Sequence, residues 1–428
     1  MSSSVHFGDS AWRMGMPVAN AEPSLAGRLR TLLTVLTILA VPVTQAFDLG
    51  GKQTNFAASD LILPFGVMFL AWQMLQGRLR LPLLTLFCLN VATVAASLAF
   101  NLDMAVATKG SWGIAIEVVK LVSLWLLFYV LVNSIRTPAD FLCAVRFWLL
   151  GAVPMALIGI GGALAYQFAG IENNYSLMFR AQGTLGDANL FACYLAISFF
   201  LALLYLKLCG KTPWVLPAIA VYLTGIFFSA SRGCMLAVGV TLAVLLAIGS
   251  SWKTRLAGGA AILLAAVVLL AIPNKNELLA SNPFTERLAT ATVSIEDDAA
   301  ADRKELWVAS VENFTSAPIF GIGHGYSRRP SDYDPHETSQ IHNTYLGLLG
   351  ETGLVGFSTY MLIFCYPVVG LWREKGSGRF ALMPLLVIGL CGLTLSLENF
   401  RGLWVVLAML EAYRRTDAMF VRRSEGRS

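Results

Sequence analysis

The chain has 428 residues, of which 56% are hydrophobic and 13% are charged; its mean hydropathy is +0.66 and its formal net charge is +5. A soluble protein carries about 25% charged residues, so about half of the usual solvating surface is missing. The composition therefore excludes a soluble enzyme, a nucleic-acid-binding protein and a disordered scaffold. At about 20 apolar residues per crossing, the apolar content would fill about twelve membrane-spanning helices.

The apolar runs predict an all-α, polytopic integral membrane protein with about twelve spans. We divide the chain into a polar tail (1–27), spans one to nine (28–272), a large loop (273–341), spans ten to twelve (342–412) and a basic tail (413–428). The expected spans are 31–47, 61–75, 82–100, 112–133, 141–168, 189–206, 215–229, 235–248, 256–272, 345–366, 380–397 and 403–412. A signal peptide is the alternative for the first run, but that run begins late and eleven spans follow it, which favours an uncleaved helix.

The distribution of Lys and Arg predicts the orientation. With the N-terminus inside, eighteen of them fall in the tails and inner loops and five in the short outer loops. Cytoplasmic loops carry the excess of positive charge. We therefore expect both termini in the cytoplasm and the large loop in the periplasm of a bacterial inner membrane.

The large loop is the expected place for chemistry, because loops of this length are usually functional. Within it, residues 299–314 place apolar side chains at helical spacing, which predicts an amphipathic helix against the membrane surface. The apolar side chains of this helix are Leu306, Trp307, Val308, Val311 and Phe314. A transporter made of two six-span halves would show internal symmetry, and the chain has no sustained repeat.

Three arginines lie on the expected outer side. Arg180 precedes span six, Arg232 lies in the turn between spans seven and eight, and Arg303 lies one helical turn before Trp307. The planar guanidinium suits phosphate oxygens, and three of them could neutralise a diphosphate without a metal. The alternative is that each arginine anchors a helix at the membrane interface or binds nearby carbonyls.

A histidine, His342, stands at the outer end of span ten, directly before Asn343. Histidine titrates near neutral pH and as a general base contributes about 10²–10⁴-fold to a rate. A helix cap is the alternative role. The position at the junction of the large loop and a span favours the functional role.

Neither a nucleotide loop nor a metal site is indicated. Residues 321–325 (GIGHG) lack the preceding strand and following helix of a nucleotide-binding loop, so we interpret them as a turn that allows close backbone approach. All seven cysteines lie in or at the ends of apolar runs, so no disulfide framework is expected. The spacing of the histidines and acids of the large loop matches no helical ligand pair. These residues are His324, Asp332, Asp334, His336 and His342.

Charged side chains within or beside the spans need partners. Glu117 and Lys120 are three residues apart and are expected to pair. Glu351 lies about 13 Å below the outer end of span ten, where it would form a pocket floor or bind another helix. Glu398 and Arg401 flank the last outer turn, and either a mutual pair or contact with the site stays open for them.

Several segments, in this order, resemble the O-antigen ligase and polymerase superfamily of bacterial membrane glycosyltransferases. The order of the segments is more specific than any one of them, and the first four spans resemble the family only in hydropathy. The segments are Arg180 with Gly183, Gly186 and Asn189, followed by 229–232 (SASR), 303–307 (RKELW), 318–323 (PIFGIG), 342–346 (HNTYL) and 351–356 (ETGLVG).

The resemblance implies a GT-C-type fold with a periplasmic active site that needs no nucleotide sugar, metal or other cofactor. Such enzymes move a glycan from undecaprenyl diphosphate to an acceptor hydroxyl, with inversion if that hydroxyl attacks opposite the departing diphosphate. It implies that His342 is the catalytic base and that Arg180, Arg232 and Arg303 bind the diphosphate. We also expect four residues to support the substrate site: Trp307, Asn343, Glu398 and Arg401.

Within the superfamily the chain is most similar to the ligase. Polymerases often carry two sizeable periplasmic loops, whereas the loop 170–188 is short, and protein-directed relatives are longer. The implied partners are an undecaprenyl diphosphate-linked glycan, a lipid A-core acceptor and membrane lipids, with no nucleic acid. A polymerase and a non-enzymatic transporter of lipid-linked glycan remain the alternatives; the transporter would need a polar pathway through the membrane midplane.

Overall fold

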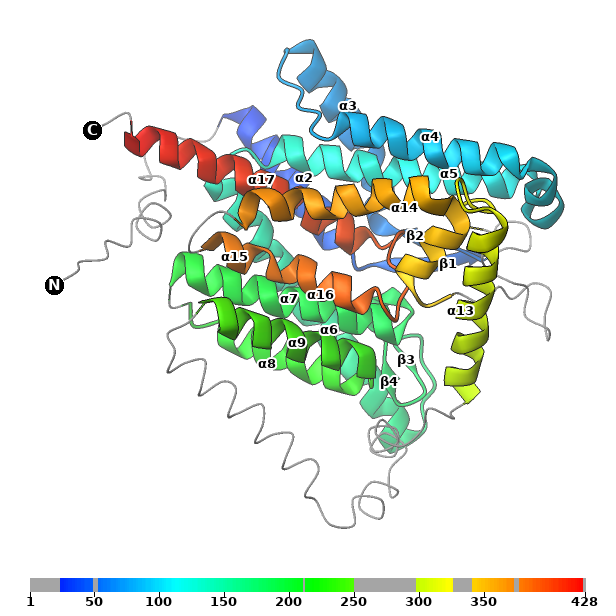
Figure 1. The fold of residues 1–428 in the computed structure, drawn as a ribbon. Helices are drawn as coiled ribbons and strands as arrows, with labels where there is room; N and C mark the ends of the chain where they lie inside the picture. The colour runs from blue at the N-terminus through cyan, green and yellow to red at the C-terminus, as the bar shows by residue number, and fades with distance from the viewer. Residues whose placement is uncertain are drawn as a thin grey trace. The chain divides into compact units, whose positions relative to one another are not determined.

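The computed structural model describes residues 24–48, 53–210, 212–249, 298–325, 341–372 and 377–425. Helices dominate these ranges, as the apolar runs predict (Figure 1). The described residues fall into two compact units. The first lies within Val145–Ile295 and Leu371–Cys391, and the second within Ala19–Ala144, Glu296–Gly370 and Gly392–Ser428.

The first unit is built around α7, which packs against α8, α9, α15 and α16. Its chain order is most of α6 (Pro138–Ala169), β3 (Ser176–Leu177), β4 (Arg180–Ala181), the 3₁₀ helix η1 (Gly183–Leu185), α7 (Ala188–Cys209), α8 (Val215–Phe228), α9 (Arg232–Gly249), α15 (Ser377–Ala381) and α16 (Met383–Cys391). The Asp187 carboxylate caps α7 by accepting hydrogen bonds from two backbone N–H groups, and Gly210 ends it with a φ of 76°. Such caps satisfy backbone groups that a helix end leaves unpaired.

Aromatic residues join α6, α7 and α8 inside the first unit. Trp148 stacks on Tyr194 with ring centroids 4.6 Å apart, and its indole nitrogen donates a hydrogen bond to Ser198 Oγ over 2.9 Å. Tyr222 of α8 donates a hydrogen bond to the carbonyl of Leu149 over 2.6 Å. Because buried polar groups cost free energy unless they are paired, these bonds fix how the three helices meet.

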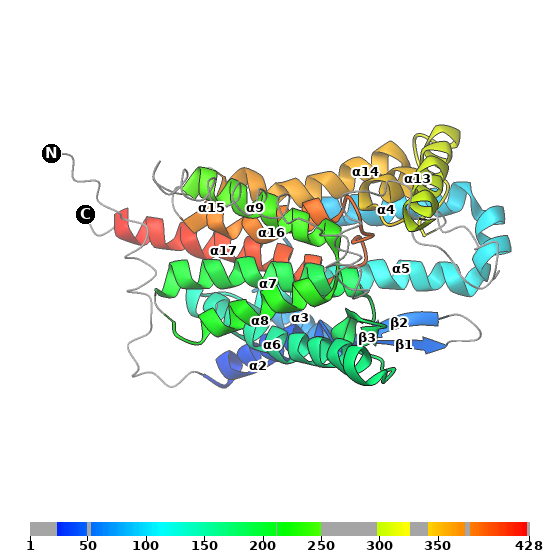
Figure 2. The same cartoon turned by 90° about the horizontal axis from the view of Figure 1, so that it is seen from below.

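The second unit is built around α5, which packs against α2, α3, α4 and α17. Its elements are α2 (Leu25–Ala40), β1 (Thr44–Asp48), β2 (Gln53–Ala57), α3 (Ala58–Leu75), α4 (Leu84–Phe100), α5 (Leu102–Ser134), α13 (Asp298–Ser316), nearly all of α14 (Thr344–Leu371) and α17 (Arg401–Glu425). The strands β1 and β2 form an antiparallel hairpin with Thr44 opposite Ala57 (Figure 2). In its core, Trp125 meets Trp404 of α17 edge-on at 5.0 Å and donates to Asn90 Oδ1.

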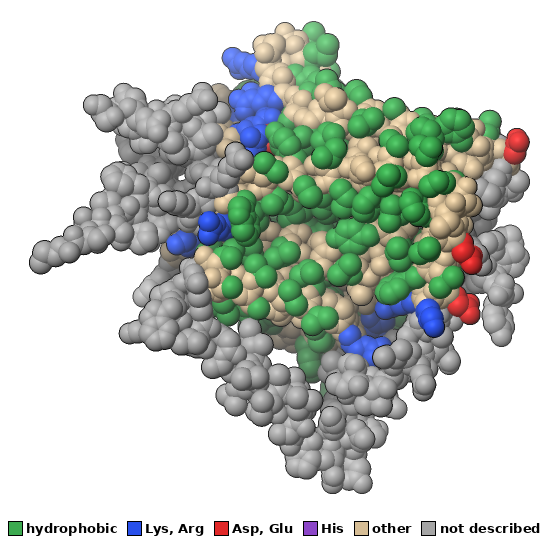
Figure 3. Space-filling model, in the orientation of Figure 1, with side chains coloured by type: hydrophobic (Ala, Val, Ile, Leu, Met, Phe, Trp, Pro, Cys, Tyr) green, Lys and Arg blue, Asp and Glu red, His purple; other side chains and the backbone are tan. Residues whose placement is uncertain are grey.

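The described helices carry the membrane character that the composition predicts. Five of them are long and apolar enough to cross a membrane, and four shorter helices are also apolar. Apolar side chains cover the helix sides on the face drawn in Figure 3, whereas charged side chains gather towards helix ends. The expected ninth span, 256–272, lies outside the described residues. The chain is thus a helical membrane protein, while the number of about twelve spans stays a prediction.

Several predicted boundaries differ from the structure. The first expected span, 31–47, ends as a helix at Ala40 and continues into β1, so the chain is mostly rather than wholly helical. The eleventh, 380–397, ends as a helix at Cys391. The twelfth, 403–412, lies in the first half of α17, which continues to Glu425 through most of the expected tail. In each case apolar composition predicted burial but did not locate the helix end.

Candidate active site

In the first unit, Arg180 lies in the hairpin β3–β4, directly before η1 and α7. Its Nε donates a hydrogen bond to the carbonyl of Ser229 and its Nη2 donates to Asn189 Oδ1, both over 3.0 Å. Gly183 in η1 has a φ of 55°, and a Cβ there would lie 2.7 Å from the Phe191 ring. The spacing of Arg180, Gly183 and Asn189 therefore has a physical reason: it folds the segment so that the guanidinium reaches the end of α8.

Arg232 begins α9 at the same turn to which Arg180 is bound. The turn starts with Ser229, whose hydroxyl donates to the carbonyl of Ile226 over 2.6 Å and accepts from Ser231 N over 3.2 Å. Ala230 has a φ of 51°, a conformation in which residues other than glycine are rare. The structure therefore brings Arg180 and Arg232 to one turn of the first unit.

In the second unit, His342 lies directly before α14, half-buried, with a φ of 51°. Asn343 follows as the N-cap of α14: its Oδ1 accepts hydrogen bonds from the backbone of Tyr345 and Leu346 over 3.0 and 3.1 Å. A helix cap was the alternative role expected for His342, but in the structure Asn343 is the residue that caps α14. The backbone at His342 is therefore strained at a cost of about 1–3 kcal/mol, which the surrounding structure must offset.

The helix expected in the large loop is present as α13, and it reaches the residue before His342. Trp307 donates a hydrogen bond from its indole nitrogen to the carbonyl of Ile341 over 3.1 Å. Arg303 lies one turn earlier on α13, about 6 Å along the helix axis. The second unit therefore brings Arg303, Trp307 and His342 to one side.

The apolar stripe expected along α13 is only partly buried. Val308 and Val311 are 50% and 48% exposed, whereas Ser310 is 1% exposed and faces α14. A Cβ at Gly350 of α14 would lie 3.1 Å from the Ser310 carbonyl, so the two helices are in close contact there. The face of α13 that is buried within the protein is therefore set by contact with α14, while the contact of its exposed valines with the membrane surface stays a prediction.

Residues 318–323 serve to break α14. Gly353 has a φ of 63°, and this break leaves carbonyls of the first helical segment without their usual partners. The backbone N–H groups of Ile322 and Gly323 donate to the carbonyls of Gly350 and Glu351, each over 3.0 Å. Beyond the break, the N–H groups of residues 354 and 355 donate to the carbonyls of residues 318 and 319. The motifs 318–323 and 351–356 are therefore joined by backbone hydrogen bonds on both sides of the break.

Glu351 carries a buried charge at this break. Its Oε2 accepts a hydrogen bond from Gly325 N over 2.7 Å and lies 3.2 Å from His324 Nδ1. Burial is the largest single influence on the pKa of His324 and lowers it, but Glu351, with Glu117 and Glu398, raises the pKa above its ordinary value. The pair joins the turn 321–325 to α14, while the two roles expected for Glu351, a pocket floor or a contact with another helix, stay predictions.

The two polar residues of the last turn have different surroundings. Arg401 binds both carboxylate oxygens of Asp60, which also accepts a hydrogen bond from Ala57 N. The Glu398 carbonyl accepts the indole N–H of Trp404 over 3.1 Å. Arg401 is therefore committed to a pair with Asp60, a partner that sequence reasoning missed because 341 positions separate the two. By contrast, Glu117 and Lys120 pair over 3.5 Å as predicted.

A connection through Thr344 ties the segment of His342 to this last turn. The Thr344 hydroxyl donates to the carbonyl of Leu395 over 2.6 Å and accepts from Leu397 N over 2.9 Å. Its backbone N–H donates to the carbonyl of Gly392. His342, Glu398 and Arg401 thus belong to connected segments of the second unit.

Backbone strain marks the predicted residues. Among the described non-glycine residues, four have a positive φ: Leu83, Met178, Ala230 and His342. Met178 and Ala230 each lie two residues before one of the predicted arginines. Strain of this kind concentrates at functional sites, where it fixes side chains in place. In the described ranges no group of three or more His, Cys, Asp and Glu residues could hold a metal ion; His336, Asp332 and Asp334 lie outside those ranges.

Part of the chain is similar to a known protein family. A search of curated proteins finds none similar to the chain. Residues 217–361, about a third of the chain, match the family model described as O-antigen ligase. The match contains Arg232, Arg303 and His342 and leaves out Arg180. This confirms the resemblance inferred from the motifs: residues 217–361 are similar to the O-antigen ligase family, whose members are membrane glycosyltransferase-like ligases and polymerases.

Proposed function

We propose that this protein is an O-antigen ligase of the bacterial inner membrane. It transfers polysaccharide from undecaprenyl diphosphate to a sugar hydroxyl of lipid A-core on the periplasmic face. The family match over residues 217–361 carries the proposal, and the strained backbone at His342 and two residues before Arg180 and Arg232 supports the choice of these residues.

In the proposed reaction, the His342 imidazole takes the proton of the acceptor hydroxyl. The hydroxyl oxygen attacks the anomeric carbon of the donor sugar and forms the new glycosidic bond. The bond between that carbon and the diphosphate oxygen breaks, and its electron pair leaves with undecaprenyl diphosphate. Attack opposite the leaving group inverts the configuration at the anomeric carbon.

Arg180, Arg232 and Arg303 bind the diphosphate and stabilise the charge that develops on it. Donors aimed at developing charge are worth about 3–4 kcal/mol each in other enzymes. Because guanidinium groups supply this positive charge, we expect no metal requirement: transfer proceeds at an unchanged rate in EDTA. Loss of transfer in EDTA and its return with a divalent cation would contradict the proposed clamp.

The second candidate function is that of a polymerase that extends lipid-linked repeat units, because the family includes both ligases and polymerases. A strain that lacks the protein distinguishes them. A ligase defect leaves lipid A-core uncapped while long polymer accumulates on its lipid carrier. A polymerase defect instead leaves single repeat units, some of them attached to lipid A-core. Normal capping in that strain would refute both assignments.

A further inference from the structure

A cluster of arginines in the second unit lies apart from the residues assigned to glycan transfer. It consists of Arg30 on α2, Arg78 and Arg80 between α3 and α4, Arg136 between α5 and α6, and Arg415 on α17. The helix ends meet so closely that Arg136 is affected by the charges of Arg30, Arg78 and Arg80, and Arg80 by those of Arg30 and Arg415. We call these five residues the arginine cluster.

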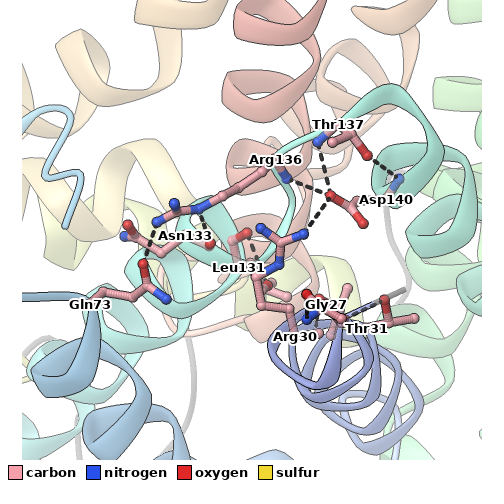
Figure 4. A network of polar contacts seen from close by, with 12 residues as sticks. Gly27, Arg30, Thr31, Gln73, Leu131, Asn133, Arg136, Thr137 and Asp140 are labelled. Carbon is pink, nitrogen blue, oxygen red and sulfur yellow. Dashed lines mark hydrogen bonds and ion pairs between the residues drawn. The ribbon is translucent and has the colours of Figure 1, made fainter. Parts of the chain in front are cut away.

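Arg136 is the fixed member of the arginine cluster (Figure 4). Its Nε donates to the carbonyl of Asn133 over 2.9 Å, and its Nη2 donates to Gln73 Oε1 over 2.7 Å and to the carbonyl of Arg78 over 2.9 Å. Each of these three acceptors is a neutral oxygen. Its positive charge is therefore placed by these bonds but not neutralised by them.

Arg80 is positioned by its backbone, which leaves its guanidinium available. Asn133, fully buried, accepts from Arg80 N and donates to the Arg80 carbonyl, each over 2.8 Å. The Arg80 guanidinium forms no hydrogen bond or ion pair with any residue in the described ranges. In the same ranges, the buried Nε of Arg30 has no hydrogen-bond partner.

The acids in contact with the arginine cluster are already engaged. Asp140 caps α6, with its Oδ2 accepting from Arg136 N over 3.1 Å and Thr137 N over 2.9 Å, and lies 3.8 Å from Arg30 Nη2 (Figure 4). Glu411 binds Arg415 and its neighbour Arg414. Among the side chains that the structure describes, five positive charges thus meet two carboxylates. This excess attracts an anion.

The pKa directions agree with an excess of positive charge. Burial lowers the pKa of Arg80, and the charges of Arg415 and Arg30 lower it further. Burial also lowers the pKa of Arg136, as do the three neighbouring arginines, while Asp140 raises it. A bound anion would reverse the electrostatic part of both shifts, and would therefore be stabilised by these groups.

The helix that carries Arg30 also exposes a stripe of leucines. Leu25, Leu29, Leu32 and Leu36 are 75%, 56%, 53% and 46% exposed and recur every three or four residues, which places them on one side of α2. At the end of α3, shortly before Arg78, Leu75 is 88% exposed. Apolar surface of this extent, on helices that also lead into a cluster with an excess of positive charge, fits a ligand that has both an anionic group and hydrocarbon chains.

We propose that the arginine cluster binds the phosphate of an anionic phospholipid headgroup, with its acyl chains along the leucine stripe of α2. Basic pockets between membrane helices bind such headgroups, and Arg forms bidentate bonds to phosphate. By the predicted orientation, this is a lipid of the cytoplasmic leaflet. The site is separate from the transfer reaction, so it stands whether or not the chain is a ligase.

The test uses the full-length protein in neutral detergent and measures binding of cardiolipin and of phosphatidylcholine by native mass spectrometry. Arg80→Gln and Arg30→Gln remove cluster charges, and Arg28→Gln is the matched control because it removes the same charge from an exposed position on α2. We expect the two cluster variants to weaken cardiolipin binding about fivefold each, and Arg28→Gln and phosphatidylcholine binding to change less than twofold.

Two further measurements, of thermal unfolding and of competition by inorganic phosphate, exclude other causes of weaker binding. Arg80→Gln should unfold at the wild-type temperature, because its guanidinium has no partner among the described residues. Inorganic phosphate alone should not displace cardiolipin at millimolar concentration. An equal loss in Arg28→Gln, unchanged cardiolipin binding in both cluster variants, or binding of inorganic phosphate without cardiolipin would each overturn the proposal.

Discussion

Replacement of His342 by glycine separates the catalytic role of this residue from its structural role. His342 has a φ of 51°, which costs a residue with a Cβ about 1–2 kcal/mol and costs glycine almost nothing. Glycine in turn loses about 0.5–1 kcal/mol more backbone entropy on folding. We therefore expect His342→Gly to leave the free energy of unfolding within about 1 kcal/mol of wild type. His342→Ala, which keeps the Cβ and the strain, should be less stable than His342→Gly by about 1 kcal/mol.

Both variants remove the imidazole, so both should lose transfer by about 10²–10⁴-fold. The measurements are thermal unfolding of the purified protein in detergent and the initial rate of glycan transfer under donor saturation. Loss of activity in a variant as stable as wild type excludes misfolding as the cause. Near-normal turnover of His342→Gly would refute the general base. Equal stability of the two variants would refute the strain.

Three further predictions concern other parts of the structure. Gly353→Ala would place a Cβ 2.4 Å from the Ile319 carbonyl oxygen and should lower the free energy of unfolding by at least about 2 kcal/mol; Gly347→Ala on the same helix meets only a side-chain atom 3.9 Å away and should not destabilise in the same denaturation assay. Arg232→Ala should raise the donor KM about tenfold or more, with Lys restoring part of the loss; unchanged donor KM would count against the diphosphate clamp. Asp60→Asn should destabilise by about 1–3 kcal/mol by leaving Arg401 unpaired, and a wild-type unfolding temperature would show that the pair contributes nothing.

Apolar runs were enough to predict most helices. The expected span 189–206 is α7, Ala188–Cys209, and the expected span 215–229 is α8, Val215–Phe228. Hydropathy works here because a lipid-exposed segment must satisfy its own backbone groups and therefore forms a helix. The rule says little about where a helix ends, which is why the helix ends near 40 and 391 were missed.

The break in α14 could not be predicted from the sequence alone. This helix contains several glycines, among them Gly347, Gly350 and Gly353, and local propensity does not distinguish them. Gly353 is the break because the segment 318–323 supplies hydrogen-bond partners on both sides of it. That requirement is tertiary, so the sequence of the helix itself carries no signal for it.

The sequence predicted which segments contribute to the candidate site, but not the side-chain contacts between them. Motifs placed His342 beside the start of a helix and Arg180 near Arg232, and the structure has both features. The pair of Arg401 with Asp60 and the hydrogen bond from Trp307 to Ile341 were not predicted. Such contacts join distant parts of the chain through side-chain geometry, for which a single sequence carries no periodic signal.

The central claim is tested most directly by reconstitution of the purified protein in vesicles with undecaprenyl diphosphate-linked polysaccharide and lipid A-core. We predict a covalent polysaccharide–lipid A-core product, without ATP or added metal, that is absent with the His342→Gly protein. Movement of the lipid-linked donor across the bilayer with no covalent product would contradict the account and favour a transporter.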